Sequence, residues 1–344
     1  MQPKVSIIVP IYNVEEYISK CLTSLENQTF KNIEIWAVSD GSPDNSAQIV
    51  KQYQKKFDNI KLIEKENGGY GSVLEYCINN IKTEYFLICD PDDWLSDDCI
   101  EVLYKKAQKN NLDIVLGDKY NFYKNTHQKK YKKSMPVALG IEPNIVYTNR
   151  NIIQSFSLGE VSPHAKLYKT TLVSGISLPH KVSYTDFVLY MIALSNAQRI
   201  EYINEPLAYY YFDRPGNTAT AVKPSIINDY LVGWDVIFSC IKNKKTYILY
   251  FRLLVQIQMI LNEYARTNVD KSYNKNFNNI YKRLSLLFPL KREILDNLPK
   301  STSNPHRILY RGLLTKKTSK LFLRALLLND KRKFKGNKLN RVKK

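Results

Sequence analysis

Short apolar runs alternate with segments of helical periodicity through the first 120 residues, and this alternation constrains the fold more than any other feature of the chain. Residues 5–9 are a short apolar run, and apolar side chains then recur at three- and four-residue steps across residues 17–25. Further strand-like runs follow at 33–38, 60–63, 85–89 and 113–116, separated by segments of helical character. This β-α-β-α order predicts an α/β domain with a mainly parallel sheet, buried on both faces by helices.

Three acids directly follow the strand predicted at residues 85–89. Asp90, Asp92 and Asp93 stand in the run Cys-Asp-Pro-Asp-Asp-Trp. Ligands of such sheets bind beyond the carboxyl ends of the strands, and carboxylates this close together repel one another unless a cation compensates their charge. Oxygen ligands of this kind suit Mg²⁺ or Mn²⁺ bound jointly with the phosphates of a substrate. The alternative is a polar turn that caps the following helix, and the position at a strand end favours the metal site.

Two other strand ends carry side chains suited to a nucleotide. Asp40 and Gly41 follow the second strand, where the acid could hydrogen-bond a base or a ribose hydroxyl and the glycine lets the backbone approach a ligand. An exposed turn rich in Asp, Ser and Gly is the alternative for this segment. Pro10, Tyr12 and Asn13 end the first strand, and Tyr12 could either face the base or pack on the sheet edge.

A glycine pair, Gly68 and Gly69, follows the third strand and is predicted to shape the wall near a diphosphate. The run Asn-Gly-Gly-Tyr-Gly-Ser does not match the G-x-G-x-x-G pattern, and no acid on a following strand completes a dinucleotide fingerprint. A nicotinamide-dependent enzyme is therefore excluded. A sugar nucleotidyltransferase is also disfavoured, because no phosphate loop rich in Gly, Arg and Lys follows the first strand.

The net charge of +19 is distributed unevenly along the chain. Residues 1–120 hold 13 Lys and Arg against 19 Asp and Glu, whereas residues 301–344 hold 14 Lys and Arg against one Asp. The basic segment also carries apolar pairs at helical spacing, such as Leu313-Leu314 and Leu321-Phe322, which predict a helix across residues 308–328. Such a helix suits an anionic membrane surface, and a core-packing helix with a solvated tail is the alternative. Binding of nucleic acid is not expected, because the sites at the strand ends are acidic.

The composition divides the chain into segments. Residues 1–222 are predicted to form one catalytic domain, with a nucleotide-binding half at 1–120 and a less regular acceptor half at 121–222. Residues 223–328, with little Gly and repeated Leu, Ile and Phe, are predicted to be a helical C-terminal region, and residues 329–344 a disordered basic tail. Five scattered cysteines, no visible signal peptide and no long apolar segment predict a cytoplasmic protein, peripheral at the inner face of the cell membrane.

Taken together and in this order, the segments resemble the inverting family-2 glycosyltransferases of the GT-A fold, of the type that builds bacterial cell-surface glycans. The resemblance rests on Val5-Ser-Ile-Ile-Val-Pro-Ile-Tyr-Asn13, Gln28-Thr-Phe30, Asp40-Gly-Ser42, Asn67-Gly-Gly69 and Asp90-Pro-Asp-Asp93. It continues through Lys166-Leu-Tyr168, Tyr184-Thr-Asp186 and the segment from Glu205 to Pro215. The resemblance therefore covers residues 4–220, and the ordered set is far more specific than any one of its members.

The resemblance implies a metal-assisted transfer of a hexose or N-acetylhexosamine from a UDP-sugar to a hydroxyl of a glycan or lipid-linked acceptor, with inversion. Asp186 matches the family's general base, and Asp40 matches the residue that contacts the uracil or the ribose. Asp92 and Asp93, with Asp90 nearby, match the ribose–diphosphate–metal cluster that holds Mn²⁺ or Mg²⁺. The remaining residues of the predicted nucleotide-sugar site are Pro10, Tyr12, Asn13, Gly41, Gly68, Gly69 and Arg214; for Arg214 the alternative is a surface ion pair.

Three positions depart from the family's pattern. Ser39 stands where many relatives have a first Asp, and Thr185 replaces the Glu that usually precedes the base. The run Gly71-Ser-Val-Leu-Glu75 lacks the Arg that commonly follows the Asn-Gly-Gly segment, which leaves the contacts to the donor phosphates open.

The alternative function is a non-catalytic nucleotide-sugar-binding partner of another transferase, and the retained Asp186 argues against it. His164 and His180 are interpreted as packing or capping residues.

Overall fold

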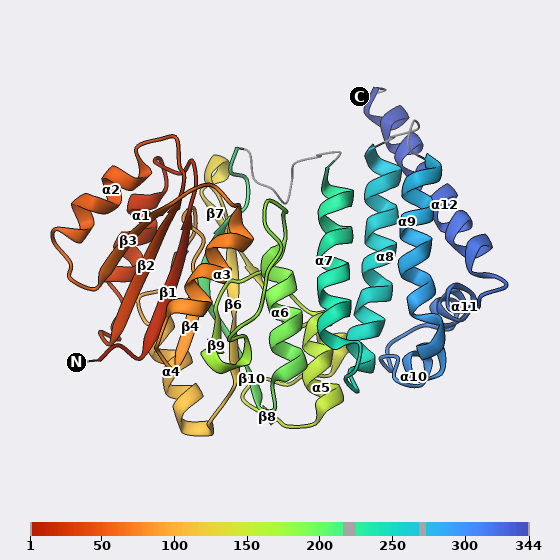
Figure 1. Cartoon of the computed structure of the whole chain (residues 1–344), viewed down its shortest axis with the longest axis horizontal. Coiled ribbons are helices and arrows are strands. Elements are labelled where there is room, and N and C mark those ends of the chain that lie inside the picture. The colour runs from red at the N-terminus through yellow and green to blue at the C-terminus, as the bar shows by residue number, and fades with distance from the viewer. Residues whose placement is uncertain (1, 216–224, 268–272, 343–344) are drawn as a thin grey trace. The chain divides into compact units, whose positions relative to one another are not determined.

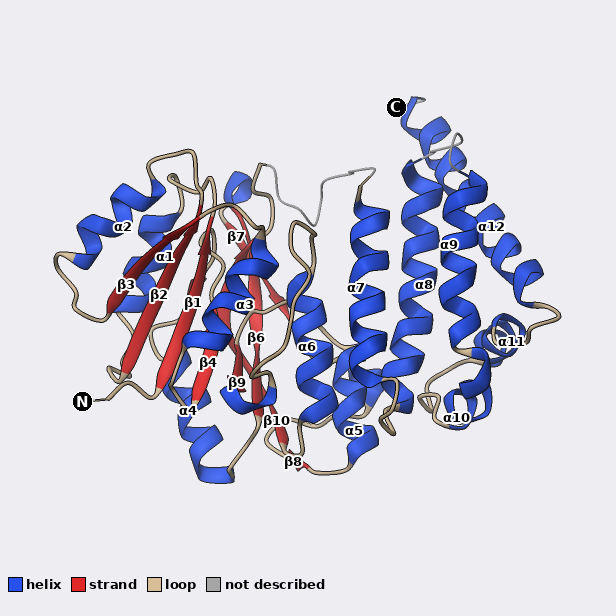
Figure 2. Ribbon diagram, in the orientation of Figure 1, coloured by secondary structure: helices blue, strands red, loops and turns tan. Residues whose placement is uncertain are grey.

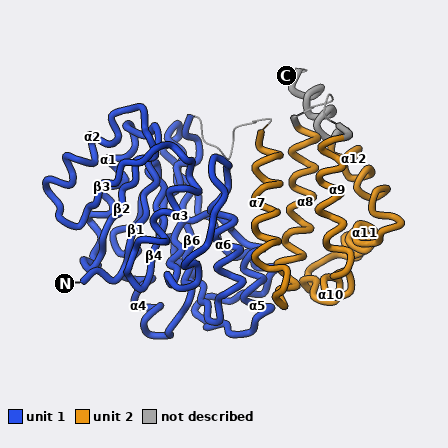
Figure 3. The backbone as a smooth tube through the Cα atoms, in the orientation of Figure 1, with its two compact units in different colours: residues 1–220 blue, residues 221–344 orange. Residues whose placement is uncertain are grey.

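The computed structural model of the chain describes residues 2–215, 225–267 and 273–342 (Figure 1). The chain forms two compact units, residues 1–220 and 221–344 (Figure 3). The first unit is built on a β-sheet, and the second consists of helices over its described residues (Figure 2). The domain boundary predicted at residue 222 lies among residues 216–224, outside the described residues.

One sheet of ten strands organises the first unit. Its strands are β1 (Val5–Ile11), β2 (Ile33–Asp40), β3 (Ile60–Lys65), β4 (Tyr85–Ile88), β5 (Trp94–Leu95), β6 (Ile114–Tyr123), β7 (Gln128–Lys132), β8 (Val146–Tyr147), β9 (Lys166–Lys169) and β10 (Ile200–Tyr211). They run in the order β3-β2-β1-β4-β9-β6-β10-β5, with β7 beside β6 and β8 beside β10. β1, β2, β3, β4, β6 and β10 point in one direction, and β5, β7, β8 and β9 run against them. The prediction of a mainly parallel sheet is therefore confirmed.

Helices cover both faces of this sheet (Figure 2). They are α1 (Ile18–Glu26), α2 (Ser46–Gln54), α3 (Tyr70–Asn80), α4 (Cys99–Asn110), α5 (Arg150–Ser155) and α6 (Thr185–Asn196). The apolar side chains of α1 and α4, among them Leu22 and Leu103, pack in one core with Ile7 of β1. Helices α3 and α6 contact each other and lie over the opposite face. The predicted α/β architecture is confirmed.

The strand β9 is the main departure from a simple β-α-β-α order. It lies between β4 and β6 and runs antiparallel to both, so that Leu167 pairs with Leu87 on one side and Val115 on the other. A strand that runs against its neighbours begins at the edge where those neighbours end. The residues that precede Lys166 are therefore brought to the edge of the sheet where β4 ends and the acidic run begins.

The second unit contains α7 (Ile226–Ile241), α8 (Tyr247–Thr267), α9 (Tyr273–Leu286), α10 (Lys291–Asp296), α11 (Asn304–Leu313) and α12 (Ser319–Val342). The predicted helical region is present. A single helix predicted across residues 308–328 is instead two helices, α11 and α12. The hydroxyls of Thr315 and Thr318 donate hydrogen bonds to carbonyl oxygens of the last turn of α11, at Arg311 and Gly312, and so help to end that helix.

The basic tail also differs from its prediction. Residues 329–342, predicted to be disordered, continue α12 as far as Val342. Lysine and arginine dominate this segment and have high helix propensity, so a basic composition does not by itself prevent a helix. Residues 343 and 344 lie outside the described part. Among the described residues, no helix combines the length and the apolar character needed to cross a bilayer.

Candidate active site

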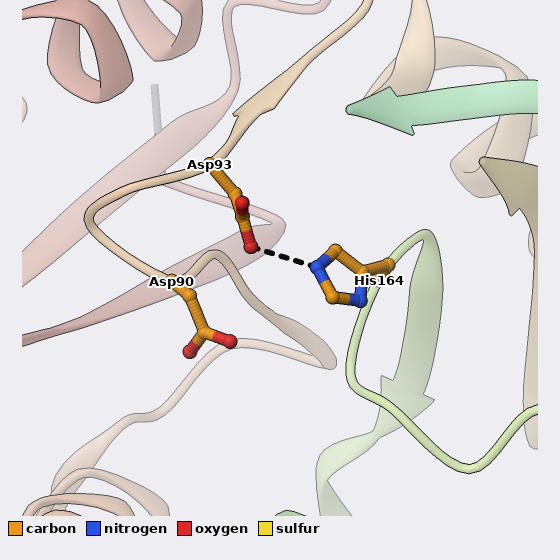
Figure 4. A group of neighbouring side chains, drawn as sticks. All are labelled: Asp90, Asp93 and His164. Carbon is orange, nitrogen blue, oxygen red and sulfur yellow. Dashed lines mark hydrogen bonds and ion pairs between the residues drawn. The ribbon is translucent and has the colours of Figure 1, made fainter. Parts of the chain in front are cut away.

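Asp93, the last acid of the predicted cluster, is buried against a histidine. It lies in the turn between β4 and β5 and is 3% exposed. Its Oδ2 is 2.7 Å from Nε2 of His164 (Figure 4). Its Oδ1 accepts a hydrogen bond of 2.7 Å from the backbone N–H of Tyr211. Burial is the main cause that raises the pKa of Asp93 and lowers the pKa of His164. Burial therefore disfavours the charged form of both groups, and the two side chains are held together by this one short contact.

Asp90 completes a group of three side chains that could hold a metal ion. Single ligand atoms of Asp90, Asp93 and His164 lie within 4.8 Å of one another (Figure 4). The hydroxyl of Tyr70 donates a hydrogen bond of 2.7 Å to Oδ1 of Asp90. Burial, followed by the charge of Asp92, raises the pKa of Asp90 to about 7. Two carboxyl groups with raised pKa values and one imidazole fit a divalent cation such as Mn²⁺, which would supply the compensating charge.

Asp92 makes a different contact from its two neighbours. Its Oδ2 lies 2.5 Å from Nε of Arg214, and the two side chains form an ion pair. This contact does not have the geometry of a hydrogen bond from the Nε–H group of Arg214. The two side chains are 12% and 19% exposed, so this pair is set into the protein rather than on its open surface. The guanidinium of Arg214 also lies 5.4 Å from the ring of Tyr17. The structure thus brings Arg214 to the predicted metal cluster, while direct metal ligation by Asp92 stays a prediction.

The predicted base, Asp186, lies in the first turn of α6. This helix begins after Tyr184, whose φ of 63° is in the left-handed region. Burial raises the pKa of Asp186 to about 6, while backbone N–H groups and the ammonium group of Lys166 act in the opposite direction. The charge of Asp186 in turn contributes to the raised pKa values of Tyr70 and Asp90. The predicted base and the metal-ligand group therefore belong to one electrostatic site.

Two buried lysines adjoin the candidate site, Lys119 next to His164 and Lys166 close enough to act on the pKa of Asp186. Lys119 of β6 and Lys166 of β9 are 3% and 0% exposed. Lys119 Nζ donates a hydrogen bond of 2.7 Å to Oγ of Ser162 and lies 3.3 Å from Nδ1 of His164, and Lys166 Nζ donates to the carbonyl oxygen of Ser162. Burial is the main cause that lowers the pKa of both lysines, that of Lys166 to about 7, and Glu160 opposes it. The lysines place positive charge beside the acids of the site.

Asp40 holds the loop that contains the glycine pair. Its Oδ1 accepts a hydrogen bond of 2.9 Å from the N–H of Gly68 and its Oδ2 one of 2.7 Å from the N–H of Gly69, while Lys65 Nζ lies 2.7 Å from Oδ1. Gly69 has φ +83° and ψ 169°, a region open essentially to glycine alone, and a Cβ there would lie 2.8 Å from the backbone nitrogen of Lys181. Asp40 thus fixes the conformation of the loop that contains Gly68 and Gly69. Its contact with a uracil or ribose stays a prediction.

The loops after β1 and β2 are joined to each other. The N–H of Asn13 donates a hydrogen bond of 2.8 Å to Oγ of Ser42, and Gly41 adopts a φ of +65° that favours glycine. Pro10 is buried within β1. Tyr12 is 52% exposed. Its predicted role, facing the base of the donor, is compatible with this exposure and stays a prediction.

His164, which the sequence indicates as a packing or capping residue, lies against the acids of the candidate site. Parallel strands place ligands at their carboxyl ends, whereas His164 lies just before the antiparallel β9. The sequence signal for it is its position two residues before the Lys166-Leu-Tyr168 segment of the family resemblance. His180, in contrast, lies 2.5 Å from Oε2 of Glu75 and is 53% exposed, so it makes a surface contact.

The mostly parallel sheet, the acids after β4 and the helical C-terminal region are those of a glycosyltransferase with the GT-A fold. The sequence profile described as "Glycosyl transferase family 2" matches residues 6–176. Together with the relatives described next, this match shows that the chain belongs to glycosyltransferase family 2.

Three known proteins illustrate the relationship. The glycosyltransferase GlyA of Streptococcus pneumoniae is 34% identical over 221 residues, which are 62% of this chain and 31% of GlyA. The uncharacterized glycosyltransferase MG025 of Mycoplasma genitalium is 31% identical over 220 residues, covering 62% of this chain and 70% of that protein. The crystal structure of S. aureus TarS 1–349 in complex with UDP-GlcNAc has a TM-score of 0.66 at 21% identity, covering 98% of this chain and 92% of that one. The match thus spans about a third of GlyA, and the likeness to TarS shows the fold.

Proposed function

We propose that the protein transfers a hexose or an N-acetylhexosamine from a UDP-sugar to a hydroxyl group of a glycan or lipid-linked acceptor, with inversion and assisted by Mn²⁺ or Mg²⁺. The observation that carries the proposal is the partly buried Asp186, whose pKa of about 6 suits a base at neutral pH and which interacts electrostatically with Asp90. The UDP-GlcNAc complex of TarS supports the donor class.

In the proposed reaction the ionised Asp186 removes the proton from the acceptor hydroxyl. The oxygen attacks the anomeric carbon of the donor from the face opposite the diphosphate, the bond between that carbon and the diphosphate oxygen breaks, and the configuration inverts. Positioned general bases typically contribute ~10²–10⁴-fold to a rate. The ammonium group of Lys166 lowers the pKa of Asp186 and so favours the form that can accept the proton.

Positive charge for the departing diphosphate is available from two sources in this proposal. Arg214 lies against Asp92 beside the acids of the site, where a guanidinium can stabilise developing negative charge. Asp90, Asp93 and His164 would hold the divalent cation, which would act as a Lewis acid on the diphosphate. Ser162 and Lys119 contact the second ring nitrogen of His164 and so orient its imidazole toward Asp93.

The test of the proposal is the release of UDP from a panel of UDP-hexoses and UDP-N-acetylhexosamines in the presence of Mn²⁺. Release of UDP above the buffer rate from one of them identifies the donor and supports an enzyme. Binding of UDP-sugars without release from any member of the panel contradicts a catalytic role and would favour the alternative, a nucleotide-sugar-binding partner of another transferase.

The turnover rate should rise with pH through a midpoint of about 6. Below this pH Asp186 is protonated and cannot act as a base, and above it the carboxylate is available. Replacement of Lys166 by Met should move the midpoint upward, because the ammonium group lowers the pKa of Asp186. Release of UDP measured across the pH range gives both midpoints, with the exposed Lys109→Met as the control. Identical midpoints in the wild type and Lys166→Met would contradict this coupling.

We also propose that the protein works at the inner face of the cell membrane, held there by its basic C-terminal helices. Ile308 of α11 is 65% exposed, and Leu321 and Leu328 of α12 are 68% and 58% exposed. Lys316 and Lys317 stand in the connection between the two helices. Exposed apolar side chains beside cations are typical of a helix that lies in the interface of an anionic membrane.

Charge reversal at Lys316, Lys317 and Lys320 should reduce co-sedimentation with vesicles that contain phosphatidylserine. Each cation near such a surface contributes ~1 kcal/mol, so the loss should exceed a hundredfold in binding. The matched control reverses Lys51, Lys55 and Lys56 at the end of α2 and should bind as the wild type does. Equal loss in both variants would mean that net charge alone, rather than the C-terminal helices, directs the protein to the vesicles.

A further inference from the structure

Four aromatic side chains form a row across neighbouring strands, on the side of the sheet that carries α1. Trp94 of β5, Tyr209 of β10, Tyr120 of β6 and Tyr131 of β7 are successive cross-strand partners. The ring centroids of Trp94 and Tyr209 are 5.2 Å apart and those of Tyr209 and Tyr120 are 5.5 Å apart, and both pairs are stacked. We call these four residues the aromatic row.

Two lysine ammonium groups lie over the aromatic row. Lys20 Nζ of α1 is 3.0 Å from the centroid of the Trp94 ring, and Lys129 Nζ of β7 is 4.8 Å from that of Tyr209. In the described part of the chain neither lysine forms an ion pair. Burial and then the charge of Lys129 lower the pKa of Lys20. Two like charges that lie over one pair of stacked rings repel each other, and an anion that contacts both relieves this repulsion.

The surrounding sequence adds to this charge. Residues 119–133 contain six lysines and no Asp or Glu. Lysines on an edge strand such as β7 also serve to prevent pairing with other chains, and that would explain their exposure. It does not explain Lys20, which comes from α1 and converges with Lys129 on one pair of stacked rings. Two elements far apart in sequence therefore build one positively charged surface.

A shallow cavity of about 340 Å³, broadly open to solvent, adjoins the aromatic row at Trp94. Its lining includes Ser19, Lys20, Thr23, Asn27, Trp94 and Asp97, from α1 and from the segment that starts with β5. Hydroxyl, amide and carboxylate groups of this kind exchange hydrogen bonds with the hydroxyl groups of a sugar or a polyol. Asp97 lines the cavity, and among the described residues it forms no ion pair with Lys20, so the cation stays available.

We propose that the aromatic row and the adjoining cavity bind an anionic polyol or glycan chain that carries phosphodiester groups. A phosphate would lie near Lys20 and Lys129, and the hydroxyl groups of a neighbouring unit would enter the cavity. This inference rests on the proposed function and adds to it the chemical class of the acceptor chain, which it assigns to a surface away from the reacting atoms.

The arrangement of the rings favours such a chain over a single-stranded nucleic acid. Nucleic-acid sites of this type use open aromatic faces on which bases stack. Here the faces of Trp94, Tyr209 and Tyr120 lie against one another, and Lys20 covers the remaining side of Trp94. The groups of this surface that a ligand can contact are the two lysine ammonium groups, the edges of the rings and the polar groups that line the cavity.

The surface is continuous with the candidate active site. The backbone N–H of Tyr211 donates to Asp93, and the ring of Tyr211 packs edge-on against Phe122 at 5.9 Å and Tyr17 at 5.8 Å. Phe122 lies 5.0 Å from Lys20 Nζ, and Tyr17 contacts Arg214 of the active site. A chain bound along the aromatic row is therefore held next to the site, where it would raise the local concentration of acceptor hydroxyls.

The test measures binding of a synthetic glycerol phosphate oligomer to the full chain by calorimetry, without donor. We expect binding that weakens with added salt, and a loss of about tenfold or more in the Lys20→Ala/Lys129→Ala double variant. The matched control, Lys55→Ala/Lys56→Ala, removes the same charge from exposed positions and should change binding by less than about twofold. Asn27→Ala should weaken binding of the oligomer but not of inorganic phosphate.

Equal losses in the two double variants, or no binding by the wild type, would overturn the inference. So would tighter binding of oligothymidylate than of the glycerol phosphate oligomer, which would indicate a nucleic-acid surface. Hydrolysis of a UDP-sugar without acceptor is measured on the same proteins. If hydrolysis proceeds while the oligomer fails to bind, this inference fails and the proposed function stands; if no UDP-sugar is hydrolysed, the proposed function fails.

Discussion

Replacement of Asp186 by Asn should lower the turnover number by about 10²–10⁴-fold, because an amide cannot accept the proton of the acceptor hydroxyl. The substitution keeps the size of the side chain in its partly buried position at the start of α6. Binding of UDP should stay within about twofold of the wild type, since the proposed role of this carboxylate belongs to the transition state. Release of UDP and calorimetric titration with UDP measure the two quantities separately.

The control for this variant is Asp98→Asn, which changes an exposed aspartate at the start of α4. It should leave both turnover and binding unchanged. Undiminished turnover in Asp186→Asn would remove this residue from the proposed reaction. A parallel loss of UDP binding would instead point to a structural effect, since the nucleotide would then sense a change outside its own contacts.

Mn²⁺ should raise the melting temperature of the wild-type protein, and Asp93→Asn or His164→Gln should strongly reduce that increase. Binding at a concentration of about 100 times Kd stabilises a folded protein by about 2.7 kcal/mol. Loss of groups that merely orient metal ligands typically costs ~10–100-fold in affinity, and loss of a ligand should cost at least as much. Thermal melts with Mn²⁺ and with a chelator give the increase for each variant, independently of catalysis.

The comparison is made within each variant, so a general loss of stability from a substitution at these buried positions does not obscure the result. Asp58→Asn, at an exposed position before β3, is the control and should keep the full increase. Because the pKa of Asp90 is raised to about 7, protons compete with the cation below this pH and the increase should grow as the pH rises through it. A full increase in both ligand variants, with its loss in Asp92→Asn, would instead support Asp92 as the main ligand.

The features that could be predicted from the sequence were local ones. A buried parallel strand shows itself as a short apolar run, so the first strands and the acids that follow them, from Pro10 to Asp93, could be located without coordinates. The site residues supplied by the antiparallel β9 region were harder to find. Nothing local to His164 shows that a strand from residues 166–169 inserts between β4 and β6 and carries it to the acids.

Contacts between side chains could likewise not be predicted from the sequence. Asp40 was predicted to bind a nucleotide, and the structure shows its carboxylate occupied by two N–H groups and the ammonium group of Lys65. Lys119 lies beyond the end of the strand predicted at 113–116, because β6 continues to Tyr123. Burial of a lysine at that point depends on partners such as Ser162 that are distant in sequence, so its presence in the site could be seen only in the folded chain.

The position of β9 makes the two predicted halves of the catalytic domain interdependent. β6 begins in the half predicted at residues 1–120 and continues to Tyr123. In the sheet it does not pair with β4 directly, because β9 lies between them and pairs with both. β9 comes from the other predicted half. A fragment that stopped at residue 120 would leave both strands with bare amide and carbonyl groups. Exchange of acceptor halves between relatives should therefore yield folded hybrids only when residues 162–169 stay with the β4 and β6 of the same protein. The crossover point for recombination should accordingly lie after β9.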